Sequence, residues 1–475
     1  MIASTRIALE SRRMALAAML LIGGCAPANY SPRTIDPDAA PAAFATRTPA
    51  QNGLAQLVVA SGYEGDWPPD QWRLETLVLV ALHFNPEIES ARAQNRVAQA
   101  ELVSAAQQRP LALQFAAEHH SRQVESNTPW SLGLALELPL VGPGRRAARV
   151  ERAAALAEVS ELGIAAAAWR VRAAVRDALI DLEASRGRER VIESQLAARR
   201  EMADLVAKRV AAGMLSAREL GQEQTAVAEL EVALDTERGR GSEAMTAMAR
   251  ALGLPLETVQ QLRLAGDTLA DHVEVPGAGA IRAAALRNRL DIVQRLLEFG
   301  AADAEVKFAV AAQYPEVKLS PGYLWDQGDN VWSLAASLLF PPGSSAQAAV
   351  REAQARRELA AQRFTALQTQ VIGEAEQASA LHDAARLRAG AADRRWQSAQ
   401  EECARVRRLF EAGAADRVEL AAARIVSLAA QTARHAAAIE RKRAVARLED
   451  VMQRPLLAEF HRLPDVAGKT AEPQR

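Results

Sequence analysis

Four short stretches of the chain alternate apolar residues with small or polar ones, a period of two that predicts β-strands. They lie near residues 110–119, 130–139, 315–325 and 332–341. In the second stretch, Trp130 and four leucines at alternate positions share one face, and the other face is small or polar. Strands of about 9–11 residues with an apolar outer face are typical of membrane β-barrels. Two hairpins of a water-soluble sheet with one dry face are the alternative.

Helical patterns occupy most of the remaining chain. Six helical segments are expected, in two groups of three: 74–108, 145–211 and 215–252, then 279–312, 346–411 and 416–453. At 1.5 Å per residue, each of the two longest segments measures roughly 100 Å. This is about the summed length of the first and last segments of its group. Each long helix is therefore expected to lie beside two shorter helices stacked end to end.

The chain contains two copies of one pattern. The segment Ala81–Ile88 matches Ala285–Ile292 without a gap, at an offset of 204. A Trp-Ser-Leu run that begins at Trp130 recurs at Trp332, an offset of 202. Anchors in the same order at a nearly constant offset predict a tandem duplication of a helix-strand-strand-helix-helix unit. That unit is far longer than a solenoid repeat, so each copy is expected to form half of one structure.

The duplication sets the domain boundaries. Repeat 1 is placed at 74–253 and repeat 2 at 279–454, and a linker at 254–278 joins them. The proline-rich stretch within 25–73 is expected to be a loosely packed linker, and 455–475 a C-terminal tail.

The N-terminus is expected to be an export signal at residues 1–24. Arginines precede a short apolar segment that is too short to span a bilayer, as in secretory signal peptides. Leu21-Ile22-Gly23-Gly24-Cys25 then resembles the bacterial lipobox. The resemblance implies cleavage before Cys25 and attachment of lipid to its thiol. An ordinary signal peptide is the alternative.

Composition narrows the class of protein. The chain is 49% hydrophobic but only 4% aromatic, and its formal net charge is −1. Near-neutral charge argues against a nucleic-acid binder. The other cysteine, Cys403, lies in a helical pattern and is expected to be buried. No apolar run beyond the N-terminus reaches the ~18 residues of a membrane helix, so the four strands are the candidate membrane part.

Four strands cannot close a membrane barrel, because bacterial barrels begin at eight strands. Open sheet edges in lipid would leave backbone groups unpaired, so several copies are expected to share one barrel. Four aromatic residues near the loop-side strand ends are candidate membrane-interface anchors: Trp130, Tyr323, Trp325 and Trp332.

Over residues 74–453 the chain resembles the outer-membrane efflux protein family, the TolC-like channels. The resemblance rests on the opening at Asn85-Pro86-Glu87-Ile88, the strand-to-helix junction from Leu138 to Arg146, two glycine turns and the duplication itself. It implies a homotrimer whose 12-stranded β-barrel continues into a long α-helical barrel. It also implies a passive exit duct in the outer membrane of a Gram-negative bacterium. The partners of such a duct are a periplasmic adaptor and an inner-membrane transporter of an efflux or type I secretion system.

The resemblance extends to the two helical tips, where the family has an acidic residue six positions after a glycine. Candidate residues for adaptor docking and gating are Gly213, Glu219, Gly413, Asp416, Arg417 and Glu419. The pattern departs from the family's at Ala212 and Ala412, which replace valine, and at Ala415, which replaces an arginine of related gates. Acids crowded around an aperture could select cations. Equally, they could cap the returning helix.

No catalytic motif, cofactor site or metal-ligand spacing emerges, so the chain is expected to be neither an enzyme nor a cofactor protein, apart from a covalent lipid. A heavy-metal cation duct is one alternative, because Gly144-Arg145-Arg146 is reminiscent of that subgroup. A periplasmic coiled-coil scaffold or adaptor lipoprotein is the other.

Overall fold

A computed structural model of the chain describes residues 31–32, 34–63, 65–107, 110–121, 128–140, 144–265 and 273–456. The expected export signal and Cys25 lie outside the described residues. The chain divides into two units, Met1–Thr46 and Arg47–Arg475. In the first unit, the described residues include one short helix, α2 (Ala39–Ala45). Everything below concerns the second unit.

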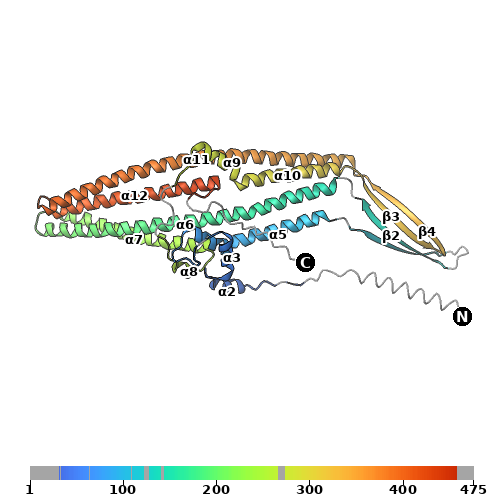
Figure 1. The fold of residues 1–475 in the computed structure, drawn as a ribbon, viewed down its shortest axis with the longest axis horizontal. Coiled ribbons are helices and arrows are strands. Elements are labelled where there is room, and N and C mark those ends of the chain that lie inside the picture. Colours follow the sequence, from blue (N-terminus) through green and yellow to red (C-terminus); the bar gives the residue numbers. More distant parts are fainter. Residues whose placement is uncertain are drawn as a thin grey trace. The chain divides into compact units, whose positions relative to one another are not determined.

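The second unit shows the predicted helix-strand-strand-helix-helix order twice (Figure 1). Repeat 1 comprises α4 (Leu74–Phe84), α5 (Pro86–Ala106), β1 (Ala112–His119), β2 (Trp130–Leu140), α6 (Arg145–Ala211) and α7 (Ala217–Leu252). Repeat 2 comprises α9 (Ala278–Asn288), α10 (Leu290–Ala311), β3 (Glu316–Asp326), β4 (Asp329–Leu339), α11 (Gly343–Glu411) and α12 (Arg417–Met452). Two short helices, α3 (Asn52–Ala60) and α8 (Leu256–Gln260), precede and follow repeat 1.

The first helix of each repeat is broken, whereas the sequence analysis expected one continuous helix; that expectation was wrong. In repeat 1 the break falls at Asn85, whose backbone is extended (φ −72°, ψ 125°) because it precedes a proline. Its side chain accepts a hydrogen bond from the Glu87 amide and so starts α5. In repeat 2 the break falls at Arg289, which has nearly the same backbone angles without a proline.

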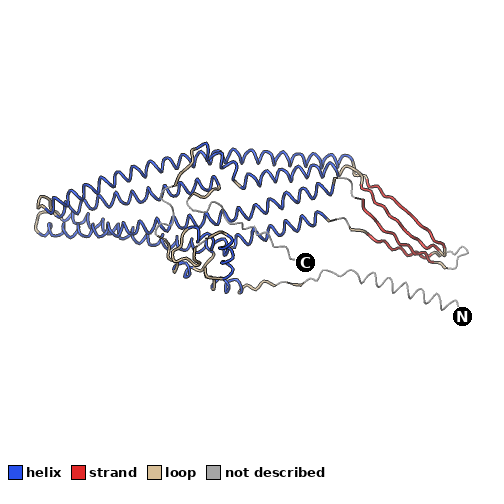
Figure 2. The backbone as a smooth tube through the Cα atoms, viewed as in Figure 1, coloured by secondary structure: helices blue, strands red, loops and turns tan. Residues whose placement is uncertain are grey.

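The four strands form one antiparallel sheet in the order β1-β2-β3-β4 (Figure 2). The central pair, β2 and β3, comes from different repeats and joins them, with Leu134 opposite Tyr323 and Leu138 opposite Leu319. The duplication therefore forms a single sheet, as expected for two halves of one structure.

The long helix α6 contacts helices of both repeats: α5 and α7 of its own, and α10 and α12 of the other. The corresponding helix α11 packs against α9, α10 and α12 of its own repeat. With 67 and 69 residues, these two helices are each roughly 100 Å long. Each lies beside two shorter helices in succession, as predicted.

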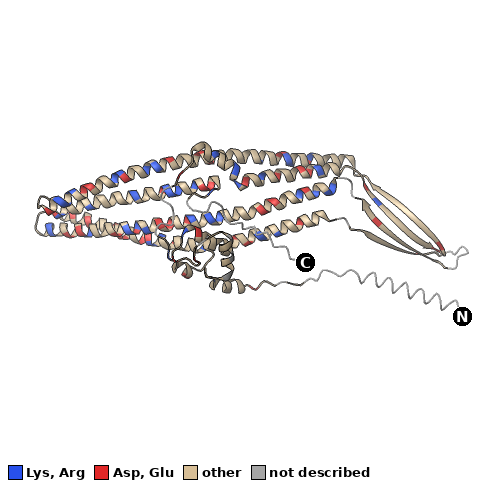
Figure 3. Cartoon of the chain, viewed as in Figure 1, with Lys and Arg blue, Asp and Glu red and all other residues tan. Residues whose placement is uncertain are grey.

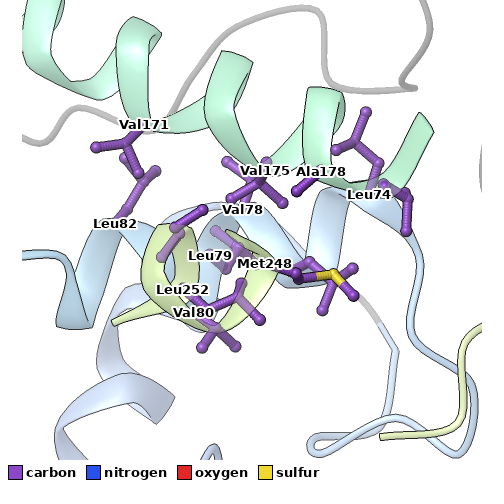
Figure 4. Close-up of a cluster of buried hydrophobic side chains, with 14 of the residues drawn as sticks. Leu74, Val78, Leu79, Val80, Leu82, Val171, Val175, Ala178, Met248 and Leu252 are labelled. Carbon is purple, nitrogen blue, oxygen red and sulfur yellow. The ribbon is translucent and has the colours of Figure 1, made fainter. Parts of the chain in front are cut away.

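The main apolar core lies where α4 meets α6 and α7 (Figure 4). Nine of the eleven residues of α4 are buried. Leu82 and Val78 of α4 approach Val171 and Val175 of α6, and Met248 of α7 lies on the opposite side. Within the described residues, no helix is both long and apolar enough to cross a membrane.

The N-terminal linker is packed more tightly than the sequence analysis expected. Within 25–73, Leu54, Val58 and Trp72 are buried in the main core. Trp72 forms a backbone bridge with Leu264 of the 254–278 linker. Arg47 donates to the carbonyls of Phe84 and Gly253, at the ends of two core helices. The loosely packed description of 25–73 was therefore wrong for its described part from residue 47 onward.

Candidate functional site

The sheet has one strongly apolar face. Residues directly opposite in an antiparallel pair project to the same side, and successive residues alternate. One face thus carries Leu113, Phe115, Trp130, Leu132, Leu134, Leu136, Leu138, Leu140, Val317, Leu319, Tyr323, Trp325, Trp332, Leu334 and Leu338. Several of these side chains are largely exposed, including Phe115 (70%), Trp332 (80%) and Leu334 (73%). Such a continuous exposed apolar surface marks a membrane or protein contact.

The opposite face of the sheet carries mostly small or polar residues, with Leu324, Val331 and Leu339 as apolar exceptions. Glu137 on β2 accepts a hydrogen bond from Gln114 on β1 (3.2 Å) and forms an ion pair with Lys318 on β3 (2.5 Å). Near the strand ends remote from the helices, Ser131 donates to Asp326 and lies 2.9 Å from the His120 imidazole nitrogen. Figure 3 shows that charged residues are otherwise sparse on the strands and frequent along the helices. A sheet with one apolar and one polar face suits a wall between lipid and water.

The four predicted interface aromatics lie on the apolar face in the half of the sheet remote from the helices. The Tyr323 and Trp332 rings are paired, with centroids 4.9 Å apart. Trp130 contacts the His119 ring at 4.8 Å. Trp325 stands opposite Leu132 on one side and Asn330 on the other. Their role as membrane anchors stays a prediction.

Both outer strands of the sheet, β1 and β4, have a partner on one side only among the described residues. Each therefore presents a row of backbone donors and acceptors, which lipid cannot satisfy.

The repeat 1 tip, where α6 turns into α7, contains two of the candidate residues. Gly213 adopts a left-handed backbone (φ 70°), which a glycine permits without strain. Glu219 accepts hydrogen bonds from the Ser216 amide (2.8 Å) and hydroxyl (3.0 Å), which completes a capping box. Both bonds lower the pKa of Glu219, and the bond from the Ser216 amide has the larger effect.

The repeat 2 tip repeats this arrangement with Gly413 at φ 76°. Asp416 caps α12 by accepting from the amides of Val418 and Glu419, and Glu419 accepts from the Asp416 amide in return. The capping role is thus present at both tips. Arg417 is exposed in the first turn of α12.

The two tips are joined by an ion pair that the sequence analysis missed. Arg209, in the last turn of α6, lies 2.6 Å from Asp416. The pKa of Asp416 is lowered most by the hydrogen bond from the Glu419 amide and next by the hydrogen bond from Arg209. No local pattern connects residues 207 positions apart, so spacing alone could not identify this pair.

A buried ion network holds α6 against α12. Arg172 makes two hydrogen bonds to the Glu449 carboxylate (2.9 and 3.1 Å), and Arg176 adds a third (3.0 Å). Arg176 also bonds Asp450 at 2.8 Å. All but Asp450 are almost fully buried. Burial would raise the pKa of Glu449, but its bonds to the two arginines hold it below the ordinary value.

Nothing among the described residues resembles a metal centre: no three His, Cys, Asp or Glu side chains gather where they could bind one ion. Cys403 is buried in α11, as expected.

A half-apolar sheet that continues directly into helices of roughly 100 Å defines the class of outer-membrane channel proteins. The chain belongs to the outer membrane efflux protein family, whose model matches residues 77–254 and 281–452. The two matched segments correspond to the two repeats. The chain is accordingly an outer-membrane efflux channel, and the scaffold or adaptor alternative is wrong. No curated protein matches the chain closely enough to count as a relative.

Solved structures show the same fold. VceC of Vibrio cholerae is 20% identical, with a TM-score of 0.65 over 81% of this chain and 99% of that chain. The outer-membrane channel OprN is 20% identical, with a TM-score of 0.67 over 89% and 98%. CusC, also 20% identical with a TM-score of 0.65, covers 83% and 95%. Because CusC is no more similar than the others, the heavy-metal alternative gains no support.

Proposed function

We propose that three copies of the chain assemble into one duct. Each copy contributes four strands to a 12-stranded β-barrel, with the apolar face toward lipid and the Glu137–Lys318 face toward the lumen. The observation that carries this proposal is the pair of open sheet edges, β1 and β4, next to an exposed apolar face. Joining β4 of one copy to β1 of the next satisfies both edges.

The duct is the passive exit of a tripartite efflux or type I secretion system, with no enzymatic activity and no cofactor. A periplasmic adaptor and an inner-membrane transporter supply the substrate and the energy. The tips at Gly213 and Gly413 dock the adaptor, because they are the ends of the helices remote from the sheet. There, Glu219, Asp416 and Glu419 serve both as helix caps and as acidic groups around the aperture.

Lipid on Cys25 gives a second attachment to the outer membrane. The barrel holds the protein in the bilayer by itself, so Cys25→Ser removes the lipid and leaves the protein membrane-embedded. The export signal at 1–24 is required for either attachment.

Membrane extracts test the duct directly. Outer-membrane fractions should contain a trimer that dissociates on heating, and the purified trimer should open stable conductances in a planar bilayer. A protein recovered as a periplasmic monomer, or a trimer without conductance, contradicts the proposal.

A further inference from the structure

Three arginines in the first two turns of α6 bond the ends of two other helices. Arg145 donates from Nε to the Ala311 carbonyl (3.1 Å) and from Nη2 to the Ala312 carbonyl (3.2 Å), at the C-terminus of α10. It also bonds the Tyr314 carbonyl. The last four carbonyls of an α-helix have no partner within the helix, so these bonds complete α10.

Arg146 and Arg149 do the same for α5. Arg146 donates through Nε and Nη2 to the Ala106 carbonyl (3.0 and 2.6 Å), and Arg149 donates to the Ala105 carbonyl (3.1 Å). A cation at a helix C-terminus is also favoured by the helix dipole. The first two turns of α6 therefore terminate one helix from each repeat.

Both terminated helices lead into the sheet. The chain passes from α5 to β1 within six residues and from α10 to β3 within five, whereas β2 leads into α6 itself. The strands β1, β2 and β3 are neighbours. Arg145 also lies 3.8 Å from Glu316, the first residue of β3. The connections to three adjacent strands therefore pass the first two turns of one helix.

The second repeat has no counterpart of this cluster. The first eight residues of α11 contain no arginine, and Arg351 is the first in that helix. Only α5 and α10 lead into strands in each copy, and α6 already bonds both C-termini. One cluster in each copy therefore reaches the C-termini of both helices that lead into strands.

We propose that Arg145, Arg146 and Arg149 form a root clamp, which sets the spacing and order of the β1, β2 and β3 ends where the helices meet the sheet. A guanidinium suits this role because it is always charged and presents several donors in a fixed plane. A lysine at the same place has one compact ammonium on a flexible stem and lacks this fixed fork, so it should hold the two carbonyls less firmly. The clamp deepens the proposed function, since it would position the membrane strands of each copy.

Amide hydrogen exchange on the full-length purified protein separates the two arms of the clamp. Arg145→Gln should speed exchange about tenfold or more in residues 308–318 and leave 103–107 and 110–114 unchanged. The double variant Arg146→Gln/Arg149→Gln should show the reverse. Arg145→Lys should restore part of the protection at 308–318. Arg152→Gln is the control, because Arg152 is on the same helix but only faces Glu305 at 3.9 Å on the surface.

Uniform acceleration in both segments and at the 205–220 tip, for either variant, overturns the clamp in favour of general destabilisation. Unchanged exchange in both variants overturns it as well. If the proposed duct function is wrong, the wild-type protein will form no membrane trimer. Hydrogen exchange in the clamp can still be measured on that protein, so the two failures are distinguishable.

Discussion

Leu334→Arg places a charge in the middle of the apolar sheet face. Leu334 lies near the centre of β4, opposite Pro321, and its side chain is 73% exposed. An arginine at the centre of a lipid-facing barrel surface costs about 2–4 kcal/mol. Three symmetry-related copies far apart in one trimer add to about 6–12 kcal/mol, comparable with the whole stability of many domains. We therefore expect outer-membrane fractions to contain no heat-dissociable trimer of this variant.

The matched control is Ser337→Asp, three residues further along the same strand and therefore on the other face. Ser337 stands opposite Lys318 on the polar face, so an added carboxylate meets water and a cation. Membrane fractionation and unheated gel electrophoresis of both variants make the comparison. If Leu334→Arg inserts as well as the wild type, or if both variants fail alike, the assignment of the two faces is refuted.

Three further changes test the helical part. Glu449→Gln leaves Arg172 and Arg176 without their charge partner and should cost about 3–5 kcal/mol in thermal or denaturant unfolding. The folded pKa of Glu449 lies below its ordinary value of 4.5, so its stabilisation of the folded state is present above pH 4.5 and is lost as the pH falls through the folded pKa. Acid unfolding followed by helical circular dichroism should therefore lack this contribution in Glu449→Gln. Asp416→Asn breaks the exposed pair with Arg209 yet can still cap α12, so stability should change by less than about 1 kcal/mol while single-channel conductance changes; equal conductance would exclude a gating role. Gly187→Ala should cost about 1–3 kcal/mol, because the added methyl group collides with the His435 ring, and His435→Ala in the same chain should recover most of the loss.

The strands and the long helices could be predicted because their signals are local. Alternation at Trp130, Leu132 and Leu134 is visible within five residues, and the glycine turn at Gly213 marks the helix end directly. The break at Asn85 also has a local signal, because the following residue, Pro86, disfavours helical backbone angles at Asn85.

Other features depend on distant residues and could not be predicted. The break at Arg289 has no proline; the Leu290 amide there is bonded by Gln453, and the Arg289 guanidinium by Glu374. The network of Arg172 and Glu449 joins residues 277 positions apart. The prolines of the N-terminal segment predict loose packing, whereas Arg47 holds this segment against the core through the carbonyls of Phe84 and Gly253.

The helices contact one another in the same order as the strands to which they connect. The strand order β1-β2-β3-β4 matches α5-α6-α10-α11, because each of these helices is joined in sequence to its strand and contacts the next helix in the series. The outer members of both series, β1 with α5 and β4 with α11, therefore lie at the same two edges of the copy.

This shared order explains why the two long helices differ in burial. Of the described residues, 23 in the interior helix α6 are buried but only 7 in the edge helix α11. Leu359, Leu381, Leu387 and Leu409 of α11 are all exposed by 42% or more, over a length of roughly 75 Å. One contact between neighbouring copies would cover this apolar side of α11 and pair β4 with β1 at the same time. Sheet closure and helix burial would then stabilise the same interface, so neither the barrel nor the helical wall should close without the other.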